Sequence, residues 1–261
     1  RSAKSPEPIR MYASRFAETL ASTMATPRTT SPRPSPSNRG IRSASSPPPS
    51  WAMWRLTTVR ACSCKFGASH TGKELFKYTA SCDAVVSCLG HNLTFKGIYG
   101  KPRLLVTEAT KRLCHAIKSH EPEHPIKYVL MNTSGNSNRD IKETISFAQK
   151  CVIGLLRLLL PPHVDNEKAA DYLRTQIGQN NRCIEWVAVR PDGLINEEEV
   201  TAYESYPSPI RSAIFNAGKI SRINVGHFMA NLINDGNLWN TWKGKMPVIY
   251  SKTTKSNTED N

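Results

Sequence analysis

The chain has 261 residues, enough for one large domain or two small ones, and its positive charge is concentrated near the start. Residues 1–80 contain 13 Lys and Arg against 3 Asp and Glu, which is +10 of the formal net charge of +14. The rest of the chain has no Lys/Arg run and no apolar run of the ~18 residues needed to span a membrane. A membrane partner and nucleic-acid binding by this part are therefore not expected.

Residues 1–50 hold nine of the 18 prolines and eleven serines. Such a segment buries too little apolar surface to offset the entropy lost on ordering, so we predict disorder over residues 11–60. The expected organisation is a basic low-complexity segment, 1–72, followed by one folded domain, 73–261. From Met11 the segment also resembles an organelle transit peptide, although its prolines would interrupt an amphipathic helix. A solvated tail is the simpler interpretation of its charge.

Apolar periodicity starts near Lys73 and alternates between helices and strands. We predict helices at 73–81, 102–117, 141–160, 164–177 and 225–233, and strands at 84–87, 126–131, 184–189, 220–224 and 247–250. The first three strands are mostly apolar and show no polar alternation, as is typical of parallel strands covered on both faces. The repeated strand–helix order predicts an α/β fold with a Rossmann-like parallel sheet and flanking helices. We expect these three strands to be parallel neighbours.

Each of these three strands ends in a turn of small or polar residues. The turns are Ser87–Gly90, Asn132–Gly135 and Arg190–Gly193. Ligands of open parallel sheets bind beyond the carboxyl ends of the strands, so the turns are expected to form the floor of a nucleotide groove.

A phosphate-binding turn is not found in the sequence. The chain contains neither G-x-G-x-x-G nor G-x-x-G-x-x-G. Residues 67–74 (GASHTGKE) follow the P-loop NTPase pattern until Glu74, which stands where a Ser or Thr hydroxyl would bind Mg²⁺. We interpret this stretch as a loop that leads into a helix.

The seven cysteines are scattered and none has zinc-site spacing, so no metal site is expected. This usage favours reduced, partly buried thiols in an intracellular protein, and we expect a cytoplasmic location.

Four segments together resemble the NmrA-like NAD(P)H-binding branch of the atypical short-chain dehydrogenase/reductase superfamily. They are DAVVSCLGH, KYVLMNTSG, EWVAVRPDGLI and INVGHFMANLI, and the resemblance covers about residues 74–261. It implies a Rossmann-type sheet that binds NADP or NAD. It also implies a set of cofactor-binding residues: Ser87, Cys88, Leu89 and Gly90 on the adenosine side, Asn132, Thr133 and Ser134 under the nicotinamide ribose, and Arg190, Pro191 and Asp192 beside the nicotinamide.

The resemblance also assigns the first two residues. In this family an Arg-Ser pair often ends the second strand and contacts the 2′-phosphate of NADP, which implies that role for Arg1 and Ser2. The chain would then begin just after that strand, with the first strand, glycine turn and first helix truncated. Residues 11–66 would be an insert.

The catalytic pattern of the family, Tyr-x-x-x-Lys, has no match in the chain. Lys168 lies one helix before the EWVAVRP strand and is the expected lysine, which binds the cofactor ribose; a surface charge is the alternative. Thr133 and Ser134 are the other expected catalytic residues. Val164, four residues before Lys168, cannot transfer a proton, and His163 is an alternative donor. For Cys88 and Arg190, a structural role is the alternative to cofactor binding.

The resemblance thus implies an oxidoreductase that transfers hydride between NAD(P)(H) and a small molecule that the sequence does not identify. Because the glycine turn and the Tyr are missing, an inactive chain is also compatible with the sequence. A non-catalytic Rossmann-like regulatory or interaction protein is the first alternative. A basic-tailed nucleic-acid-associated protein is the second.

Overall fold

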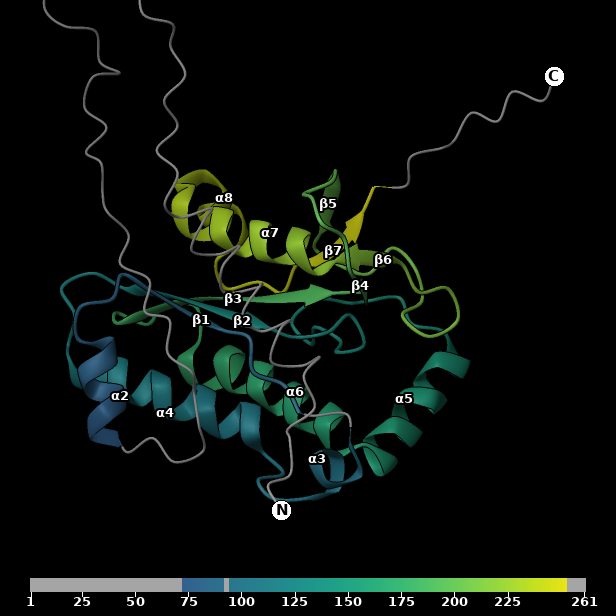
Figure 1. The fold of residues 1–261 in the computed structure, drawn as a ribbon, viewed down its shortest axis with the longest axis horizontal. Helices are drawn as coiled ribbons and strands as arrows, with labels where there is room; N and C mark the ends of the chain where they lie inside the picture. Colours follow the sequence, from purple (N-terminus) through teal and green to yellow (C-terminus); the bar gives the residue numbers. More distant parts are fainter. Residues whose placement is uncertain (1–71, 92–93, 253–261) are drawn as a thin grey trace, which may run out of the picture.

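The structure is a computed structural model that describes residues 72–91 and 94–252 (Figure 1). The predicted disorder of residues 11–60 and the cofactor roles of Arg1 and Ser2 fall outside these residues. The domain boundary expected at residue 72 remains a prediction.

Five strands form one sheet in the order β1-β2-β3-β7-β5. The parallel strands are β1 (Ala84–Ser87), β2 (Ile126–Met131), β3 (Ile184–Pro191) and β7 (Val248–Ser251), and β5 (Tyr203–Tyr206) runs antiparallel to β7 at the edge. Two short strands, β4 (Gly193–Ile195) and β6 (Lys219–Ser221), form a separate parallel pair. This architecture confirms the predicted fold class and the adjacency of the first three strands.

Helices cover both faces of the sheet (Figure 1). On one face lie α2 (Gly72–Thr79), α4 (Leu105–Ser119) and α6 (Pro161–Tyr172), and on the other α7 (Arg222–Asn234) and α8 (Gly236–Trp242). Successive side chains of β2 enter opposite layers: Tyr128 and Leu130 pack in the core under α4 and α6, whereas Val129 packs under α7. The mostly apolar strands are therefore buried on both faces.

Several predicted elements differ from the structure at their boundaries, and at two of these boundaries a serine caps a helix. The helix expected from residue 141 is α5 (Phe147–Leu159), because Ser146 accepts a hydrogen bond from the backbone N–H of Gln149. The strand expected over 220–224 ends at Ser221, which accepts from the N–H of Asn224 and starts α7.

The segment before the third strand also differs from the prediction. The two prolines that stop α5 are themselves the first residues of α6. A π-helical turn, η1 (Leu173–Ile177), follows α6. It ends at Gly178, whose φ of 72° favours glycine. The short helix α3 (Phe95–Tyr99) was not predicted from the sequence.

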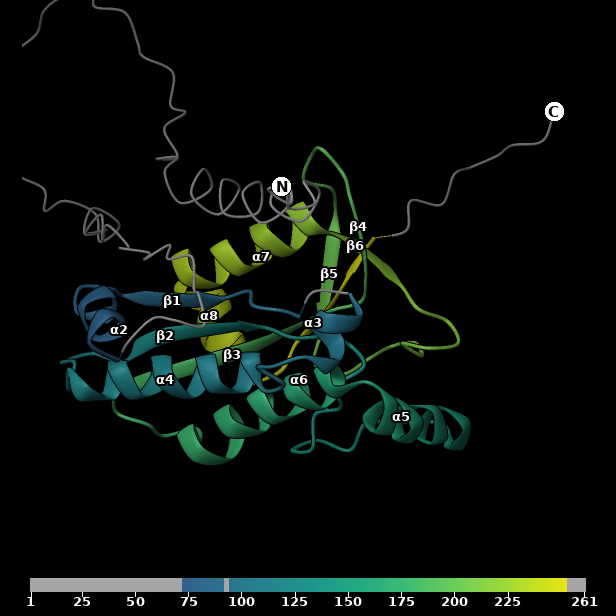
Figure 2. The same ribbon diagram turned by 60° about the horizontal axis from the view of Figure 1, so that its bottom comes forward.

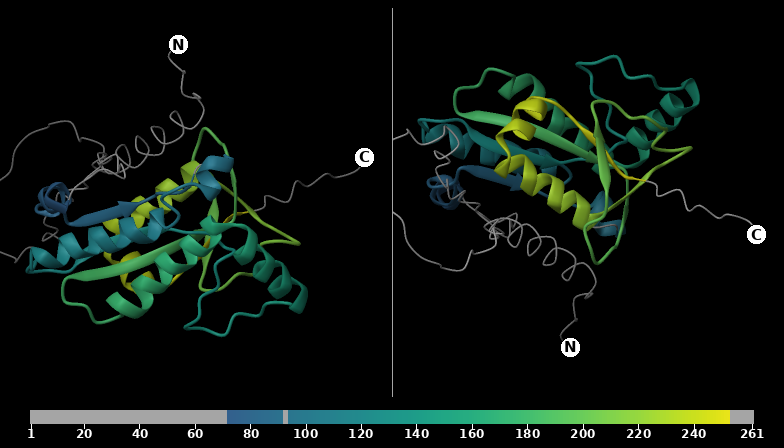
Figure 3. Two further views of the ribbon diagram at one scale, coloured as in Figure 1. Left: turned by 90° about the horizontal axis from the view of Figure 1, so that it is seen from below. Right: turned by 90° about the horizontal axis from the view of Figure 1, so that it is seen from above.

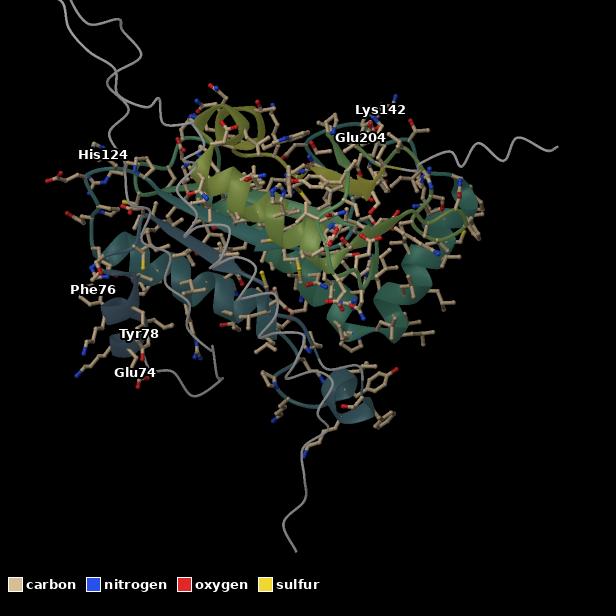
Figure 4. The ribbon with its side chains drawn as sticks, turned by 45° about the horizontal axis from the view of Figure 1, so that its top comes forward. Glu74, Phe76, Tyr78, His124, Lys142 and Glu204 are labelled. Carbon is tan, nitrogen blue, oxygen red and sulfur yellow. The ribbon has the colours of Figure 1, made fainter. Side chains whose placement is uncertain are left out.

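The carboxyl ends of the parallel strands point toward one end of the molecule (Figures 1 and 4). Lys142 and Glu204 lie near that end in Figure 4, whereas Phe76 and His124 lie at the opposite end. Across the described residues, no helix combines the length and apolarity required to cross a bilayer.

Candidate functional site

The three strand-end turns lie side by side, as predicted. Ser87 pairs in register with Leu130 of β2, and Met131 pairs with Val189 of β3. Beyond the strands, the backbone N–H of Asn132 donates to the carbonyl of Val189 at 2.7 Å. The N–H of Ser134 donates to the carbonyl of Pro191 at 3.0 Å. The parallel pairing therefore continues into the turns and fixes their relative positions.

Side-chain hydrogen bonds join the second and third turns. The hydroxyl of Ser134 donates to Oδ1 of Asp192 at 2.9 Å, and Oδ2 of Asp192 accepts from the N–H of Gly218 at 2.7 Å. Ser134 and Asp192 are both buried. Both carboxylate oxygens of Asp192 are thus used within the protein, which links these turns to the start of β6.

Asn132 connects the second turn to α6. Its side-chain amide donates to the carbonyl of Asn166 at 2.9 Å, and its Oδ1 accepts from the N–H of Thr133 at 2.8 Å. Thr133 is half-buried, and its hydroxyl oxygen accepts a long hydrogen bond, 3.4 Å, from the N–H of Gly135. No hydrogen bond between described residues uses the hydroxyl hydrogen of Thr133, so this group can donate to a ligand.

Two neighbouring side chains of the first turn pack in different core layers. Cys88 packs with the layer under α7, and Leu89 packs with the layer under α4 and α6. Burial raises the pKa of the Cys88 thiol to about 12, so the thiol stays protonated and packs as an apolar group. Gly90 is exposed, and a Cβ added to it would meet no heavy atom within 4 Å. The backbone at Gly90 is therefore open to a ligand.

Arg190 is fully buried among protein acceptors. Its guanidinium lies 2.8 Å from Oε1 of Glu143 and donates to the carbonyls of Met246 and Asn136 at 2.7 and 2.8 Å. A third carbonyl, that of Pro207, accepts at 3.2 Å. This arrangement favours the structural role that the sequence left open for Arg190.

His91 and Asp165 form a buried pair beside the first turn. Nε2 of His91 lies 2.8 Å from Oδ2 of Asp165, and Nδ1 lies 3.3 Å from the carbonyl of Gly97. Asp165 also accepts from the N–H groups of Val106 and Thr107, at 2.8 and 2.9 Å, in the first turn of α4. One carboxylate therefore ties α6 to the start of α4 and to the segment after Gly90.

Lys168 lies on the exposed side of α6. Asp165 and Ala169 of the same helix are buried, and the Lys168 amine forms no hydrogen bond or ion pair with the described residues. The structure therefore does not bring this lysine to the second turn.

His163, at the start of α6, lies against that turn instead. A Cβ added to Gly135 would be 3.6 Å from Cε1 of His163 and 3.9 Å from Oγ1 of Thr133. Nε2 of His163 lies 3.4 Å from Oε1 of Glu167, one helical turn later. Nδ1 of His163 forms no hydrogen bond with the described residues.

An arginine holds Glu167 in place. Nε of Arg157 donates to both carboxylate oxygens of Glu167, at 2.9 and 3.1 Å, and Nη2 donates to Oε1 at 2.9 Å. Burial alone would raise the pKa of Glu167, but the hydrogen bonds from His163 and Arg157 outweigh it and bring the pKa to about 2. Glu167 is therefore an ionised partner for His163 at neutral pH.

Sequence reasoning missed His91, Asp165, Glu167 and Gly218. The His91–Asp165 contact spans 74 residues and the Asp192–Gly218 contact spans 26, so no local spacing indicated them. The i,i+4 spacing of His163 and Glu167 was the one available signal.

These residues fit part of a nicotinamide dinucleotide. Open backbone at Gly90 suits the adenosine side, and the Thr133 hydroxyl suits the nicotinamide ribose. Glycine-rich patterns for the pyrophosphate are missing from the sequence. The fit is therefore partial.

The sequence of residues 67–236 matches the family model described as NAD(P)H-binding. The chain belongs to this NAD(P)H-binding family. The match covers all three strand-end turns and confirms the resemblance on which the sequence analysis relied.

Solved structures similar to this NAD(P)H-binding chain include the oxidoreductase ylbE from Lactococcus lactis, at 16% identity and a TM-score of 0.47, covering 72% of this chain and 71% of that one. A short-chain dehydrogenase/reductase from Veillonella parvula in complex with NADP has 14% identity and a TM-score of 0.47, with coverage of 72% and 71%. A Rossmann-fold NAD(P)-binding protein from Shigella flexneri has 14% identity and a TM-score of 0.43, with coverage of 73% and 71%. No curated protein matches the chain in sequence.

Proposed function

We propose that the chain is an NAD(P)H-dependent oxidoreductase whose reacting centre lies over the second strand-end turn. The observation that carries the proposal is the junction of Thr133, Gly135 and His163, which places a free hydroxyl and an imidazole at the carboxyl ends of the parallel strands. The cofactor, when bound, supplies or accepts the hydride. The small-molecule substrate and the choice between NAD and NADP stay open.

The residues of the chain orient the substrate and handle the proton. The hydroxyl of Thr133 donates to the substrate oxygen, and Nδ1 of His163 carries the proton that this oxygen gains or loses. Glu167 stabilises the imidazolium, because its carboxylate is fixed by Arg157 and stays ionised. Ser134 positions the turn through Asp192. Lys168 keeps the ribose-binding role expected from the resemblance only if its side chain leaves the exposed side of α6.

Cofactor binding to this chain is expected to be weak. A glycine turn normally supplies several N–H contacts to the pyrophosphate, each contributing roughly 1.5–3 kcal/mol. The loss of two such contacts weakens binding about a hundredfold or more, since about 1.4 kcal/mol is a factor of ten. Grafting a first strand with a G-x-x-G-x-x-G turn onto the start of the chain, with residues 11–65 deleted, should restore tight binding.

The test is NADPH oxidation with small carbonyl compounds by the full chain and by three variants. His163→Ala and Thr133→Val should each lower kcat about tenfold or more, because each removes a group that acts on the reacting oxygen. His115→Ala, an exposed histidine on α4, is the matched control and should keep the activity of the unmodified chain. Equal activity in His163→Ala and the unmodified chain would contradict the assignment of the proton to His163.

A cofactor-binding protein without turnover is the second candidate. The exposed position of Lys168 and the missing Tyr favour it. Binding of NADPH with no oxidation of it by any tested carbonyl compound would support this candidate.

A further inference from the structure

Helix α5 presents an apolar stripe to solvent. Phe147, Leu155 and Leu158 are 82%, 54% and 79% exposed, and the exposed Cys151 lies between them at helical spacing. We call these four residues the α5 face. The helix buries only Gln149 and Ile153 against the rest of the domain. Large side chains exposed in one row on a helix are typical of an interaction surface.

Two aromatic side chains of α3 extend the α5 face. The hydroxyl of Tyr99 donates to the carbonyl of Leu159 at 3.0 Å, which joins α3 to the end of α5. Phe95 is 81% exposed, and its ring centroid lies 4.9 Å from that of Tyr99. Figures 1, 2 and 3 show α5 projecting from the body of the domain in every view. The projection leaves the α5 face accessible to a broad, flat partner.

The two chain segments that carry this surface contain basic but no acidic residues. Residues 94–107 and 146–164 contain no Asp or Glu. Four exposed cations within these two segments form no ion pair with the described residues: Lys96, Lys101, Arg103 and Lys150. Arg157 is neutralised by Glu167. The apolar surface is thus bordered by uncompensated positive charge.

We propose that the α5 face, with Phe95 and Tyr99, is a docking surface for an anionic lipid bilayer. Apolar and aromatic side chains that lie in line beside Lys and Arg are the pattern of helices that bind in the membrane interface. The cations attract acidic headgroups, while Phe and Leu side chains enter the acyl boundary. A second copy of the chain would instead bring like charges together at the same surface.

This contact needs no membrane-spanning helix, because an interfacial helix lies in the plane of the bilayer. It revises the expectation that the protein has no membrane partner. It is also independent of the proposed oxidoreductase activity, since no residue of the α5 face belongs to the strand-end turns.

The test is co-sedimentation of the full chain with vesicles. The chain should pellet with vesicles of phosphatidylcholine and phosphatidylserine and pellet far less with pure phosphatidylcholine. Leu155→Ser/Leu158→Ser should weaken binding to the anionic vesicles about tenfold or more, which corresponds to about 1.4 kcal/mol or more. Both leucines are exposed, so the variant should fold, and thermal melting checks this. Hydrogen exchange over residues 147–159 should slow when the vesicles are added.

A matched control is Ile210→Ser/Phe215→Ser, which removes two other exposed apolar side chains, 55% and 60% exposed, from a loop far from α5 in sequence. It should bind as the unmodified chain does. The basic first 80 residues are present in every variant, so their attraction for the vesicles cancels in the comparison. Equal binding by Leu155→Ser/Leu158→Ser and the unmodified chain would overturn the proposal. So would a dimer that this variant converts to a monomer.

Discussion

Nε2 of His91 lies 2.8 Å from Oδ2 of Asp165, and both side chains are almost completely buried. Each ring nitrogen of His91 faces an oxygen atom of the protein. The same carboxylate accepts from two backbone N–H groups at the start of α4. The pair therefore joins the segment after the first strand-end turn to two helices.

Asp165→Ala should destabilise the protein by about 3–5 kcal/mol at neutral pH. The substitution leaves a buried histidine and two N–H groups without their acceptor. Urea unfolding measures the loss. Asp171→Ala is the control, because Asp171 pairs with Arg139 and Arg174 near the surface and should cost about 1 kcal/mol or less. Equal costs for the two variants would contradict the role given to Asp165.

The ion pair of Glu167 should make stability depend on pH in acid. The pKa of Glu167 is lowered from 4.5 to about 2 in the folded protein. Its stabilising contribution is therefore complete above the pKa of the unfolded chain and is lost as the pH falls through the folded value. Unfolding free energies between pH 5 and pH 2 should fall more for the unmodified chain than for Glu167→Gln. A constant difference between the two proteins across this range would show that the carboxylate is not held by His163 and Arg157.

Arg190 should contribute to stability rather than act only as a ligand. Arg190→Met leaves the buried carboxylate of Glu143 without its partner and should cost about 3–5 kcal/mol in urea unfolding. Adding Glu143→Met should recover part of this loss, because the double variant buries no unpaired charge. Strictly additive losses would mean that the two side chains do not act as a pair.

The first and last residues of a strand could be predicted from the sequence where an apolar run is clearly bounded on both sides. β1 and β2 begin and end where the sequence placed them, because Asp83 precedes the first apolar run, and Pro125 and Asn132 flank the second. Short elements such as α3 and β5 have no comparable signal. Their four or five residues depend on partners distant in the chain, as in the pairing of Tyr203 with Ser251.

The candidate site was predictable in position but not in composition. Strand order located the turns at Asn132 and Asp192 correctly, since carboxyl ends of parallel strands meet at one edge. The direction of the Lys168 side chain depends on which side of α6 packs against the rest of the domain. Asp165 and Ala169 are on the buried side, so Lys168 faces outward. Tertiary contacts of this kind decide which side chains reach a site, and sequence spacing does not encode them.

The most direct test of the account is a calorimetric titration of NADPH into the full chain and into Gly90→Leu. The site requires open backbone at Gly90, where an added Cβ meets no heavy atom within 4 Å, so that a leucine should leave the fold intact. Gly236→Leu is the matched control, because Gly236 is equally open and lies at the start of α8. The account predicts weak binding by the unmodified chain, the same binding by Gly236→Leu, and none by Gly90→Leu. Unchanged binding by Gly90→Leu would show that the cofactor does not lie over the strand-end turns.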